Sequence, residues 1–231
     1  MARKRKERLH QQTRDEIKQA ALSQMEQTGT GTLSLRAVAR EIDLTPSALY
    51  YYYSDRDALI TDLLIEAFTS LNDAVEAAVG LDTLTYVERG RAVISAYRRW
   101  ALDNPIYYKL IYGNPIPGYQ APEELDASIA GRGLTAILGV LNQALEAGAL
   151  QLPTVSLSPE IAAQIAAMVE ERGLNSPPEL IYLVLVMWFK LHGMVSLELY
   201  GQSIDILGSG KALFDNELDR MLKDLGFTMV D

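Results

Sequence analysis

The chain has 231 residues, of which 48% are hydrophobic and 22% are charged, and its formal net charge at pH 7 is -9. These values are typical of a folded protein with a sizeable core and one or two domains, and they exclude a disordered chain. There is no cysteine and there are only two histidines, which excludes thiol catalysis, disulfide bonds and zinc–thiolate sites. We therefore expect no bound metal and no cofactor.

The charge is distributed unevenly along the chain. Residues 1–60 carry ten Lys or Arg and eight Asp or Glu, whereas the remaining residues carry eleven and twenty-two. The first eighteen residues alone have seven basic and three acidic side chains. A basic N-terminus on an acidic body indicates a nucleic-acid-binding surface at the N-terminal end, and the acidic body should weaken non-specific binding by repelling phosphates.

Residues 1–12 are polar and basic, so we expect either a solvated tail or an arm that reaches DNA phosphates or the minor groove. The next segment, 13–28, is the first predicted helix. Gly29 and Gly31 end it, and they lack the third glycine and the preceding strand of a phosphate-binding loop. The inner face of this helix is formed by apolar residues at helical spacing: Ile17, Ala20, Ala21, Leu22 and Met25.

Residues 33–59 predict two short helices joined by a tight turn at Asp43-Leu44. Ser34 caps the first helix, and Thr45 caps the second, which has Pro46 at its first position. Leu49 and Tyr53 are four residues apart and face inward. The buried face of the first helix consists of Val38 and Ala39, with Ile42 at its end. This is a helix-turn-helix pattern, whose second helix can enter the DNA major groove.

The second of these helices carries four consecutive tyrosines, 50–53, which cannot all face inward because they sweep most of a helical turn. Tyr53 aligns with Leu49 and belongs to the core. Tyr50, Tyr51 and Tyr52 are left wholly or partly outward, and exposed aromatic residues at this density indicate a binding surface. The alternative for Tyr50 and Tyr51 is packing against the first helix.

The same stretch resembles the DNA-binding domain of the TetR family of transcriptional regulators. The resemblance covers about the first quarter of the chain and includes Gly29 and the segments 34–36, 49–53 and 55–59. There are two departures from the family pattern. Asp43 replaces a glycine in the turn, and Asp tolerates left-handed backbone. Tyr53 replaces a phenylalanine, so its hydroxyl needs a partner when buried.

The resemblance implies a set of DNA contacts. Tyr50 and Tyr51 would face bases, while the Tyr52 hydroxyl and the capped start of the helix at Ser34 would meet phosphates. The full set of expected DNA-binding residues is Ser34, Arg36, Thr45, Pro46, Ser47, Tyr50, Tyr51, Tyr52 and Arg56.

A fourth helix follows and runs to about Val79. Ser54 is its predicted cap, with Asp57 completing a capping box. Arg56 lies in the first turn against the preference of the helix dipole, which favours a phosphate contact. The inner stripe of this helix, which should connect the DNA-binding head to the body, is Leu59, Leu63, Leu64, Ala67, Phe68, Leu71 and Val75.

The rest of the chain reads as helical throughout, with no convincing alternating strand. Proline and glycine breaks predict helices at 84–103, 105–112, 123–148, 158–172, 178–201 and 210–225. We expect an all-α fold of about nine to ten helices. Its three-helix DNA-binding domain with the basic arm occupies 1–57, and a helical effector-binding and dimerisation domain occupies 58–231.

No secretory signal is visible, and the longest apolar run, Leu180–Phe189, has about half the length needed to cross a bilayer. We therefore expect no membrane association and a cytoplasmic location, which the absence of cysteine also suits.

Aromatic residues in the helical body mark a candidate effector cavity, since such sites are largely apolar with a few polar groups. Trp188, His192 and Gly193 also resemble a subgroup of TetR C-terminal domains. The alternative is a core Trp with a hydrogen-bonded His, and core tyrosines with hydroxyls at the rim; Gly193 would permit a close helix approach. The candidate effector-binding residues are Tyr97, Trp100, Tyr107, Tyr108, Tyr112, Trp188 and His192.

The last two helices are rich in apolar residues, and the resemblance implies that they pair with their copies in a homodimer. The leading interpretation is a ligand-responsive repressor that binds a palindromic double-stranded operator and is released by a small, rather apolar effector. The alternative is an all-helical ligand-binding or interaction protein whose helix-turn-helix does not bind DNA. No catalytic motif supports an enzyme. The sequence does not identify the operator, the effector or the regulated genes. It also leaves open the choice between repressor and activator and the number of dimers per operator.

Overall fold

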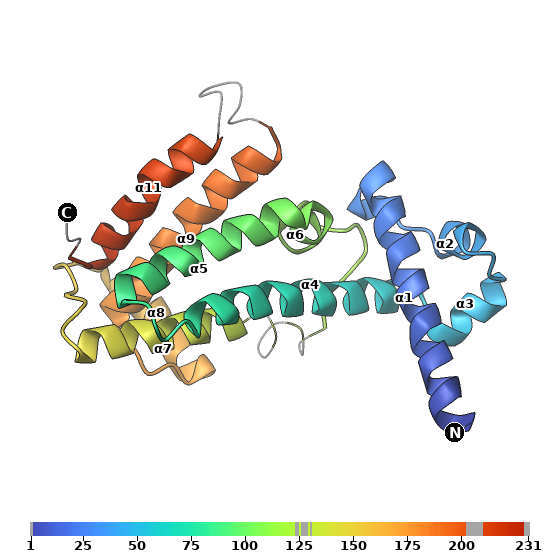
Figure 1. Ribbon diagram of the computed structural model, residues 1–231, viewed down its shortest axis with the longest axis horizontal. Helices are drawn as coiled ribbons and strands as arrows, with labels where there is room; N and C mark the ends of the chain where they lie inside the picture. The colour runs from blue at the N-terminus through green and yellow to red at the C-terminus, as the bar shows by residue number, and fades with distance from the viewer. Residues whose placement is uncertain (1, 123–124, 126–128, 130, 202–209, 229–231) are drawn as a thin grey trace. The chain divides into compact units, whose positions relative to one another are not determined.

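The computed structural model describes the chain except residues 1, 123–124, 126–128, 130, 202–209 and 229–231 (Figure 1). The described residues form ten α-helices and one short 3-10 helix, η1 (Thr30–Thr32). No strand occurs among them, apart from an isolated antiparallel bridge between Leu150 and Phe227. The all-α class and the expected number of helices are confirmed.

The chain divides into two compact units. Unit 1 comprises residues 1–69 and 104–129, and unit 2 comprises residues 70–103 and 130–231. The helix α4 (Arg56–Val79) contributes to both. The segment 104–129 groups with unit 1, although we assigned it to the C-terminal domain. Sequence position alone does not reveal such long-range contacts. The division at residue 57 stays a prediction about domains.

Unit 1 is built from α1 (Ala2–Thr28), α2 (Leu35–Glu41), α3 (Pro46–Tyr52), the first part of α4 and α6 (Pro105–Tyr112). The five inner residues predicted for the first helix are all buried, as are Val38, Ala39 and Leu49. They form one core with Leu59, Leu63 and Leu64 at the start of the α4 stripe and with Leu110 and Ile116 from the 104–129 segment. Helical periodicity therefore identified the core of the head correctly.

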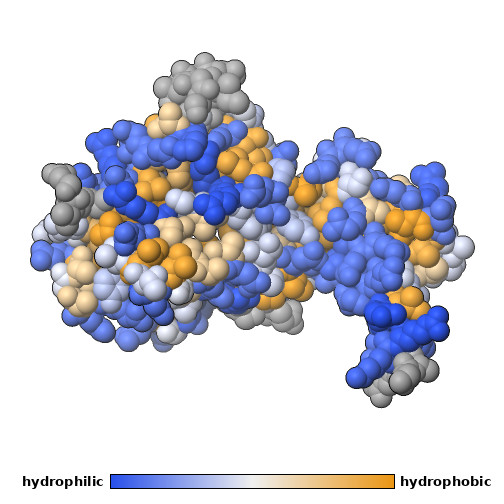
Figure 2. All heavy atoms as spheres, viewed as in Figure 1, coloured by the Kyte–Doolittle hydropathy of each residue, from blue (hydrophilic) through white to orange (hydrophobic). Residues whose placement is uncertain are grey.

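α1 begins much earlier than expected. The structure continues the helix through residues 2–12, which we considered as a tail or an arm, so the basic side chains of this segment lie on a helix. In Figure 2 this end of α1 forms a strongly hydrophilic projection at the lower right. Lys4, Arg5, Lys6 and Arg8 are all exposed.

The turn between α2 and α3 has the predicted geometry. Ser34 Oγ accepts from the Ala37 amide at 3.4 Å, and Thr45 Oγ1 accepts from the Ala48 amide at 3.2 Å. Asp43 adopts a φ of 54°, the left-handed conformation that a glycine would favour. Two local caps and one left-handed residue thus fix where each short helix begins and ends.

The predicted cap of α4 is wrong by one residue. Asp55 Oδ1, rather than Ser54, accepts the Ala58 amide at 2.8 Å, and Ser54 Oγ donates to the other oxygen of Asp55 at 3.0 Å. The helix starts one residue later than a Ser54 cap requires, so the carboxylate reaches the third amide and Asp57 completes no capping box. These hydrogen bonds lower the pKa of Asp55, the bond from Ala58 most of all.

In its described residues, unit 2 combines the end of α4 with five further helices. Their bounds agree with the predicted ranges to within two residues, except that α7 starts at residue 132; part of the predicted range 123–148 lies outside the described residues. The helices are α5 (Tyr86–Asp103), α7 (Arg132–Glu146), α8 (Pro159–Arg172), α9 (Pro178–Leu199) and α11 (Gly210–Leu225). α9 packs against α5, α8 and α11.

α9 is long and apolar enough, by length and composition, to cross a membrane, although only 28% of its most apolar stretch is buried within the chain. The apolar part of α9 is therefore longer than the run Leu180–Phe189 considered in the sequence. Its buried face carries Leu180, Val184, Leu191 and Val195. The opposite side keeps exposed apolar residues, among them Phe189 with 62% exposure. α9 is therefore apolar on both faces, of which one is buried within the chain and the other is exposed.

Gly193 does not mark a close contact within the described chain. A Cβ placed there would meet no atom within 4 Å. The expected close helix approach at Gly193 therefore does not occur within the described chain, because this position faces away from the described neighbours of α9.

The left-handed residue of the turn gives a first testable prediction. Asp43→Ala should lower the free energy of unfolding by about 1 kcal/mol, because a Cβ without a locally bonding side chain is disfavoured at positive φ. Asp43→Gly should equal or exceed the wild type, and Asp43→Asn should lie between them. Urea unfolding followed by circular dichroism measures all three, and equal stability of the Ala and Gly variants would contradict the assigned backbone conformation.

Candidate nucleic-acid interface

The outer surface of α3 carries the predicted base-contacting side chains. Tyr50 and Tyr51 are 49% and 69% exposed, while Leu49, on the opposite face of the helix, is buried. Ser47 and the capping residue Thr45 are also exposed. The two tyrosines therefore do not pack into the head, and the structure leaves aromatic and hydroxyl groups on the side of α3 that faces solvent.

Tyr52 differs from its two neighbours because it is half-buried. Its ring centroid lies 4.8 Å from that of His10 on α1 and 5.3 Å from that of Tyr51. His10 also meets the edge of Tyr51, with ring centroids 5.8 Å apart. The early turns of α1 thus support the aromatic surface of α3, so the alternative of packing against the first helix holds in part for Tyr51, while the partner residue His10 was not predicted.

Ser34 is fixed on both sides. Its hydroxyl caps α2, and its backbone amide donates to Gln24 Oε1 on α1 at 3.1 Å. Arg36 follows in the first turn of α2 and is exposed. The start of α2 therefore presents a hydroxyl, helix amides and a cation together, which is a suitable group for binding a phosphate.

Tyr53 closes α3 and connects three helices. It is only 3% exposed, and its hydroxyl donates to Asp62 Oδ2 on α4 at 2.5 Å. Arg14 of α1 donates to the same oxygen at 2.8 Å, and its guanidinium lies 4.9 Å from the centroid of the Tyr53 ring. The extra hydroxyl of Tyr53 thus has the partner that burial requires.

The charge state of this cluster follows from its contacts. Burial opposes ionisation of Asp62, but the hydrogen bonds from Tyr53 and Arg14 and the positive charges of Arg14 and Lys18 outweigh it, so the pKa of Asp62 is lowered. Burial and the bond to Asp62 raise the pKa of Tyr53. At neutral pH the cluster therefore holds an ionised carboxylate between a neutral phenol and a guanidinium.

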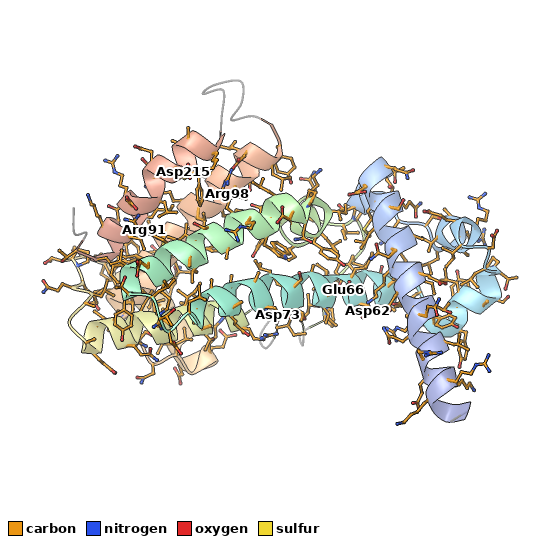
Figure 3. The ribbon with its side chains drawn as sticks, in the orientation of Figure 1. Asp62, Glu66, Asp73, Arg91, Arg98 and Asp215 are labelled. Carbon is orange, nitrogen blue, oxygen red and sulfur yellow. The ribbon has the colours of Figure 1, made fainter. Side chains whose placement is uncertain are left out.

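A second carboxylate on α4 binds α1 and α6 together. Glu66 pairs with Lys18 of α1 and accepts from the Tyr107 hydroxyl of α6 at 2.5 Å. Figure 3 shows Asp62 and Glu66 on the same stretch of α4. They are four residues apart, one helical turn, so one face of α4 anchors both the first helix and the α6 segment.

Arg56 has a partner inside unit 1. Its Nη2 donates to the Pro117 carbonyl at 2.8 Å, and its Nε lies 3.3 Å from Asp57 Oδ1. The loop that contains Pro117 is further held by Tyr119, whose hydroxyl lies 3.0 Å from Thr61 Oγ1. A phosphate contact by Arg56, as the motif suggests, would have to share or replace the bond to Pro117.

Four of the seven predicted effector residues belong to unit 2. In unit 2, the Tyr97 hydroxyl lies 3.0 Å from His192 Nδ1, Trp188 stacks on His192 with centroids 5.1 Å apart, and Trp100 Nε1 donates to Ser70 at 2.9 Å. Burial lowers the pKa of His192, so the ring is neutral at pH 7. The hydrogen-bonded histidine agrees with the core alternative.

The remaining three candidates belong to unit 1. Tyr108 is fully buried with its ring 5.2 Å from that of Tyr112, and Tyr107 binds Glu66 as described. The seven residues are therefore divided between the two units. Within the described parts of the chain, no group of three or more His, Asp or Glu is arranged to hold a metal ion.

Sequence analysis missed Arg14 and Asp62 because both are polar residues beside apolar stripes. Arg14 lies three residues before Ile17, and Asp62 lies next to Leu63. The available signal for this ion pair was that each residue carries one sign of charge at the edge of a helix face predicted to point inward.

Two sequence profiles match this chain. The profile of bacterial regulatory proteins of the tetR family matches residues 17–63, and that of the tetracyclin repressor-like C-terminal domain matches residues 91–221. HTH-type transcriptional regulator Rv1816 of Mycobacterium tuberculosis is 33% identical over 191 residues, which cover 81% of each protein.

Solved structures are similar as well. The crystal structure of SCO4313 has a TM-score of 0.78 and 31% identity, with 94% of this chain and 98% of that chain covered. A protein with unknown function from Rhodococcus sp. RHA1 has a TM-score of 0.68 and 23% identity, with 92% and 95% covered. At that identity, the second similarity concerns the fold alone.

The Asp62 cluster gives the second prediction. Asp62→Asn should lower the free energy of unfolding by about 2 kcal/mol at pH 7, because two bonds to an ionised acceptor are weakened. Since the pKa of Asp62 is lowered in the folded state, its contribution is present above about pH 4 and is lost as the pH falls further. The deficit of the variant should therefore shrink in acid.

Urea unfolding at a series of pH values measures this effect. Asp73→Asn is the matched control, since Asp73 is an exposed carboxylate on the same helix that pairs with Arg132, and its replacement should change stability by less than about 1 kcal/mol. A deficit for Asp62→Asn that is equal to the control, or that is independent of pH, would contradict the assigned charge state.

Proposed function

The chain belongs to the TetR family of helix-turn-helix transcriptional regulators, a family of DNA-binding proteins and not of enzymes, and we propose that it is a repressor that binds a palindromic operator as a homodimer. The observation that carries this proposal is the exposed Tyr50-Tyr51 pair on a helix whose start is capped by Thr45 and whose end is held by Tyr53. A regulator of this kind acts on DNA, so we expect it in the cytoplasm.

In the proposed complex, α3 lies in the major groove. Tyr50, Tyr51 and Ser47 face the bases, where their rings and hydroxyls can contact thymine methyl groups and base edges. The Tyr52 hydroxyl, the starts of α2 and α3, Arg36 and Arg56 contact phosphates and fix the register. Half-buried Tyr52 and exposed Tyr51 suit these two different roles.

The homodimer is proposed to form through α9 together with α11. Exposed apolar residues of α9 and of the position directly after it share one face with Gly193, since with this glycine they are spaced by three or four positions: Val186, Phe189, Leu197 and Tyr200. A second copy of the same face would bury them, and the open space at Gly193 would let two α9 helices approach closely. Two-fold symmetry then presents two α3 helices to half-sites about one DNA turn apart.

The effector is proposed to be a small, rather apolar molecule bound by the helical body. Its influence equals its differential affinity for the DNA-binding and non-binding conformations. We keep the aromatic candidates as two separate groups, since each group lies within one unit. The group in unit 2 is Tyr97, Trp100, Trp188 and His192, and the group in unit 1 is Tyr107, Tyr108 and Tyr112.

Selection of bound sequences from a random DNA pool tests the repressor proposal. We expect a palindromic consensus whose affinity falls steeply with salt concentration. Tyr51→Ala should relax the base preference within each half-site. The double variant Tyr52→Phe, Arg56→Ala should instead weaken binding to all sequences and reduce the salt slope by about one, because phosphate contacts carry no sequence information.

The two variants control for each other, because they lie on the same surface. Unchanged affinity of the double variant would overturn the phosphate assignment. No enriched sequence for the wild type, with weak binding that vanishes near physiological salt, would favour a helical interaction protein that does not recognise DNA.

The dimer proposal gives a further prediction. Phe189→Glu should convert a dimer to a monomer, because two carboxylates would be buried near the symmetry axis, and operator affinity should fall at least about tenfold. Sedimentation velocity measures the change of mass. Leu81→Glu is the control, since Leu81 is 43% exposed and lies outside α9. A Phe189→Glu protein that remains dimeric would refute this use of α9.

A further inference from the structure

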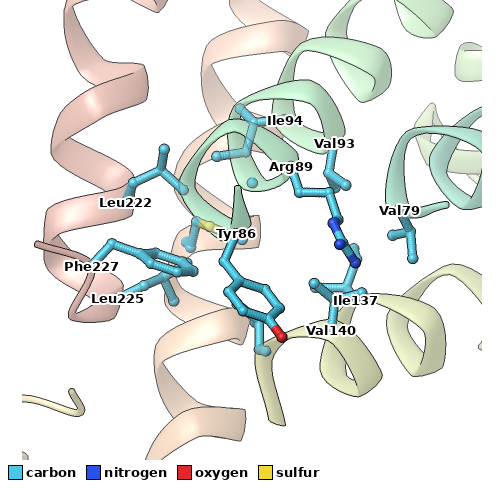
Figure 4. A pocket seen from close by; sticks show the side chains of 13 residues that line it. Val79, Tyr86, Arg89, Val93, Ile94, Ile137, Val140, Leu222, Leu225 and Phe227 are labelled. Atoms are coloured by element: carbon cyan, nitrogen blue, oxygen red, sulfur yellow. The ribbon is translucent and has the colours of Figure 1, made fainter. Parts of the chain in front are cut away.

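We propose that a hollow in unit 2 binds a small carboxylate with a short apolar chain, and that the guanidinium of Arg89 recognises the carboxylate. Figure 4 shows the site, which lies among the end of α4, the start of α5, and parts of α7, α9 and α11. None of the seven effector candidates named above lines it. That the ligand also controls DNA binding rests on the proposed function.

The walls of the hollow are almost entirely apolar. Val93 of α5, Ile137 and Val140 of α7, and Leu222 of α11 face it, with Phe227 beyond the end of α11. The wall between α5 and α11 is tight, because a Cβ at Gly90 would lie 2.6 Å from Leu222 Cδ2. Such walls favour an aliphatic group and offer no partner to a strongly hydrated ion.

Arg89 is the charged residue in this largely apolar lining. It is only 9% exposed, and its Nε finds no hydrogen-bond partner among the described residues. The guanidinium lies 5.3 Å from the centroid of the Tyr86 ring. A buried guanidinium N–H without an acceptor is unfavourable, so an added anionic acceptor at this position would be bound rather than merely tolerated.

Among the described residues, the carboxylate that pairs with Arg89 is Asp82, and it is a poor partner. Asp82 Oδ1 lies 3.4 Å from Nη1, beyond the usual length of a charged hydrogen bond, and the Asp82 side chain is 87% exposed. Asp82 therefore leaves most of the guanidinium to the hollow. A ligand carboxylate would bind the same cation from the apolar side and would compete with Asp82.

The size of the hollow sets the length of the ligand. Its volume is about 30 Å³, which is room for about two water molecules. A chain of a few carbons fits if flexible side chains such as Met187 move slightly. The small apolar hollow and the single guanidinium together favour short aliphatic carboxylates. Inorganic phosphate needs more hydrogen-bond donors than one guanidinium provides, and Arg89 repels amines.

The site is placed where it could influence the head. Val79, the last residue of α4, lines the hollow, and the same helix carries Asp62 at its other end. A ligand that shifts the end of α4 relative to α5 would change the helix on which the Tyr53 and Arg14 contacts are built. This step assumes the operator binding proposed above.

The test titrates the full-length protein without DNA with acetate, propanoate, butanoate and pentanoate at constant ionic strength. Saturation-transfer NMR and thermal unfolding report binding. Butanol, butylamine and inorganic phosphate serve as probes of other chemistry. We expect carboxylates alone to bind and to raise the unfolding temperature, with affinity increasing with chain length until the hollow is filled.

Variants of the chain assign the site. Arg89→Gln should weaken butanoate binding at least about tenfold, and Asp82→Asn should strengthen it by removing the competing carboxylate. Arg91→Gln is the matched control, because Arg91 is on the same helix, is exposed and pairs with Asp219 at 2.9 Å. If Arg89→Gln does not fold, Val140→Leu should weaken binding of pentanoate more than of acetate by narrowing the hollow.

Three results would overturn the proposal: no carboxylate binding to the wild type, equal binding of butanol, or butanoate binding that Arg89→Gln and Arg91→Gln change equally. The effect on DNA is measured separately with the selected operator. Carboxylate binding that leaves operator affinity unchanged would keep the site and remove its regulatory role. Failure of operator binding with intact carboxylate binding would contradict only the proposed repressor.

Discussion

The geometry of the head depends on one ionised carboxylate. Asp62 accepts hydrogen bonds from Tyr53 at the end of α3 and from Arg14 of α1, so one oxygen on α4 fixes the relative positions of three helices. Apolar contacts alone would bury these helices together but would leave their rotation about one another less defined. Since α3 has only seven residues, its orientation cannot come from the helix itself and must be imposed at its two ends.

How much the sequence predicted depended on the range of the interaction. Ser34, Thr45 and Asp43 act on atoms within a few residues, and the predictions for them were confirmed by the hydrogen bonds and by the backbone. The cap of α4 was misplaced by a single residue because Ser54 and Asp55 are both good capping residues, and only the observed start of the helix decides between them.

Predictions that needed long-range packing fared less well. Periodicity identified the apolar stripes of α1 and α4, yet it could not show that Arg14 and Asp62 meet across them. The tyrosines of residues 97–112 are close in sequence, but Asn104 begins a segment that packs with a different unit, so nearness in sequence was misleading. The pattern predicted a close helix approach at Gly193 but could not name the partner helix, and the structure shows open space there within the described chain.

The helical state of residues 2–12 changes what the basic N-terminus can do. An α-helix with its side chains is about 10–12 Å across, whereas the minor groove of B-DNA is about 6 Å wide. A segment that stays helical therefore cannot enter that groove as an extended arm can, and its cations can approach the duplex only from outside, along the sugar–phosphate ridges. Lys4 and Arg8 are one helical turn apart and point the same way, so they act as a pair of charges on a rigid rod. Insertion into the minor groove would first require these turns of α1 to unwind, which would also detach His10 from the tyrosines of α3.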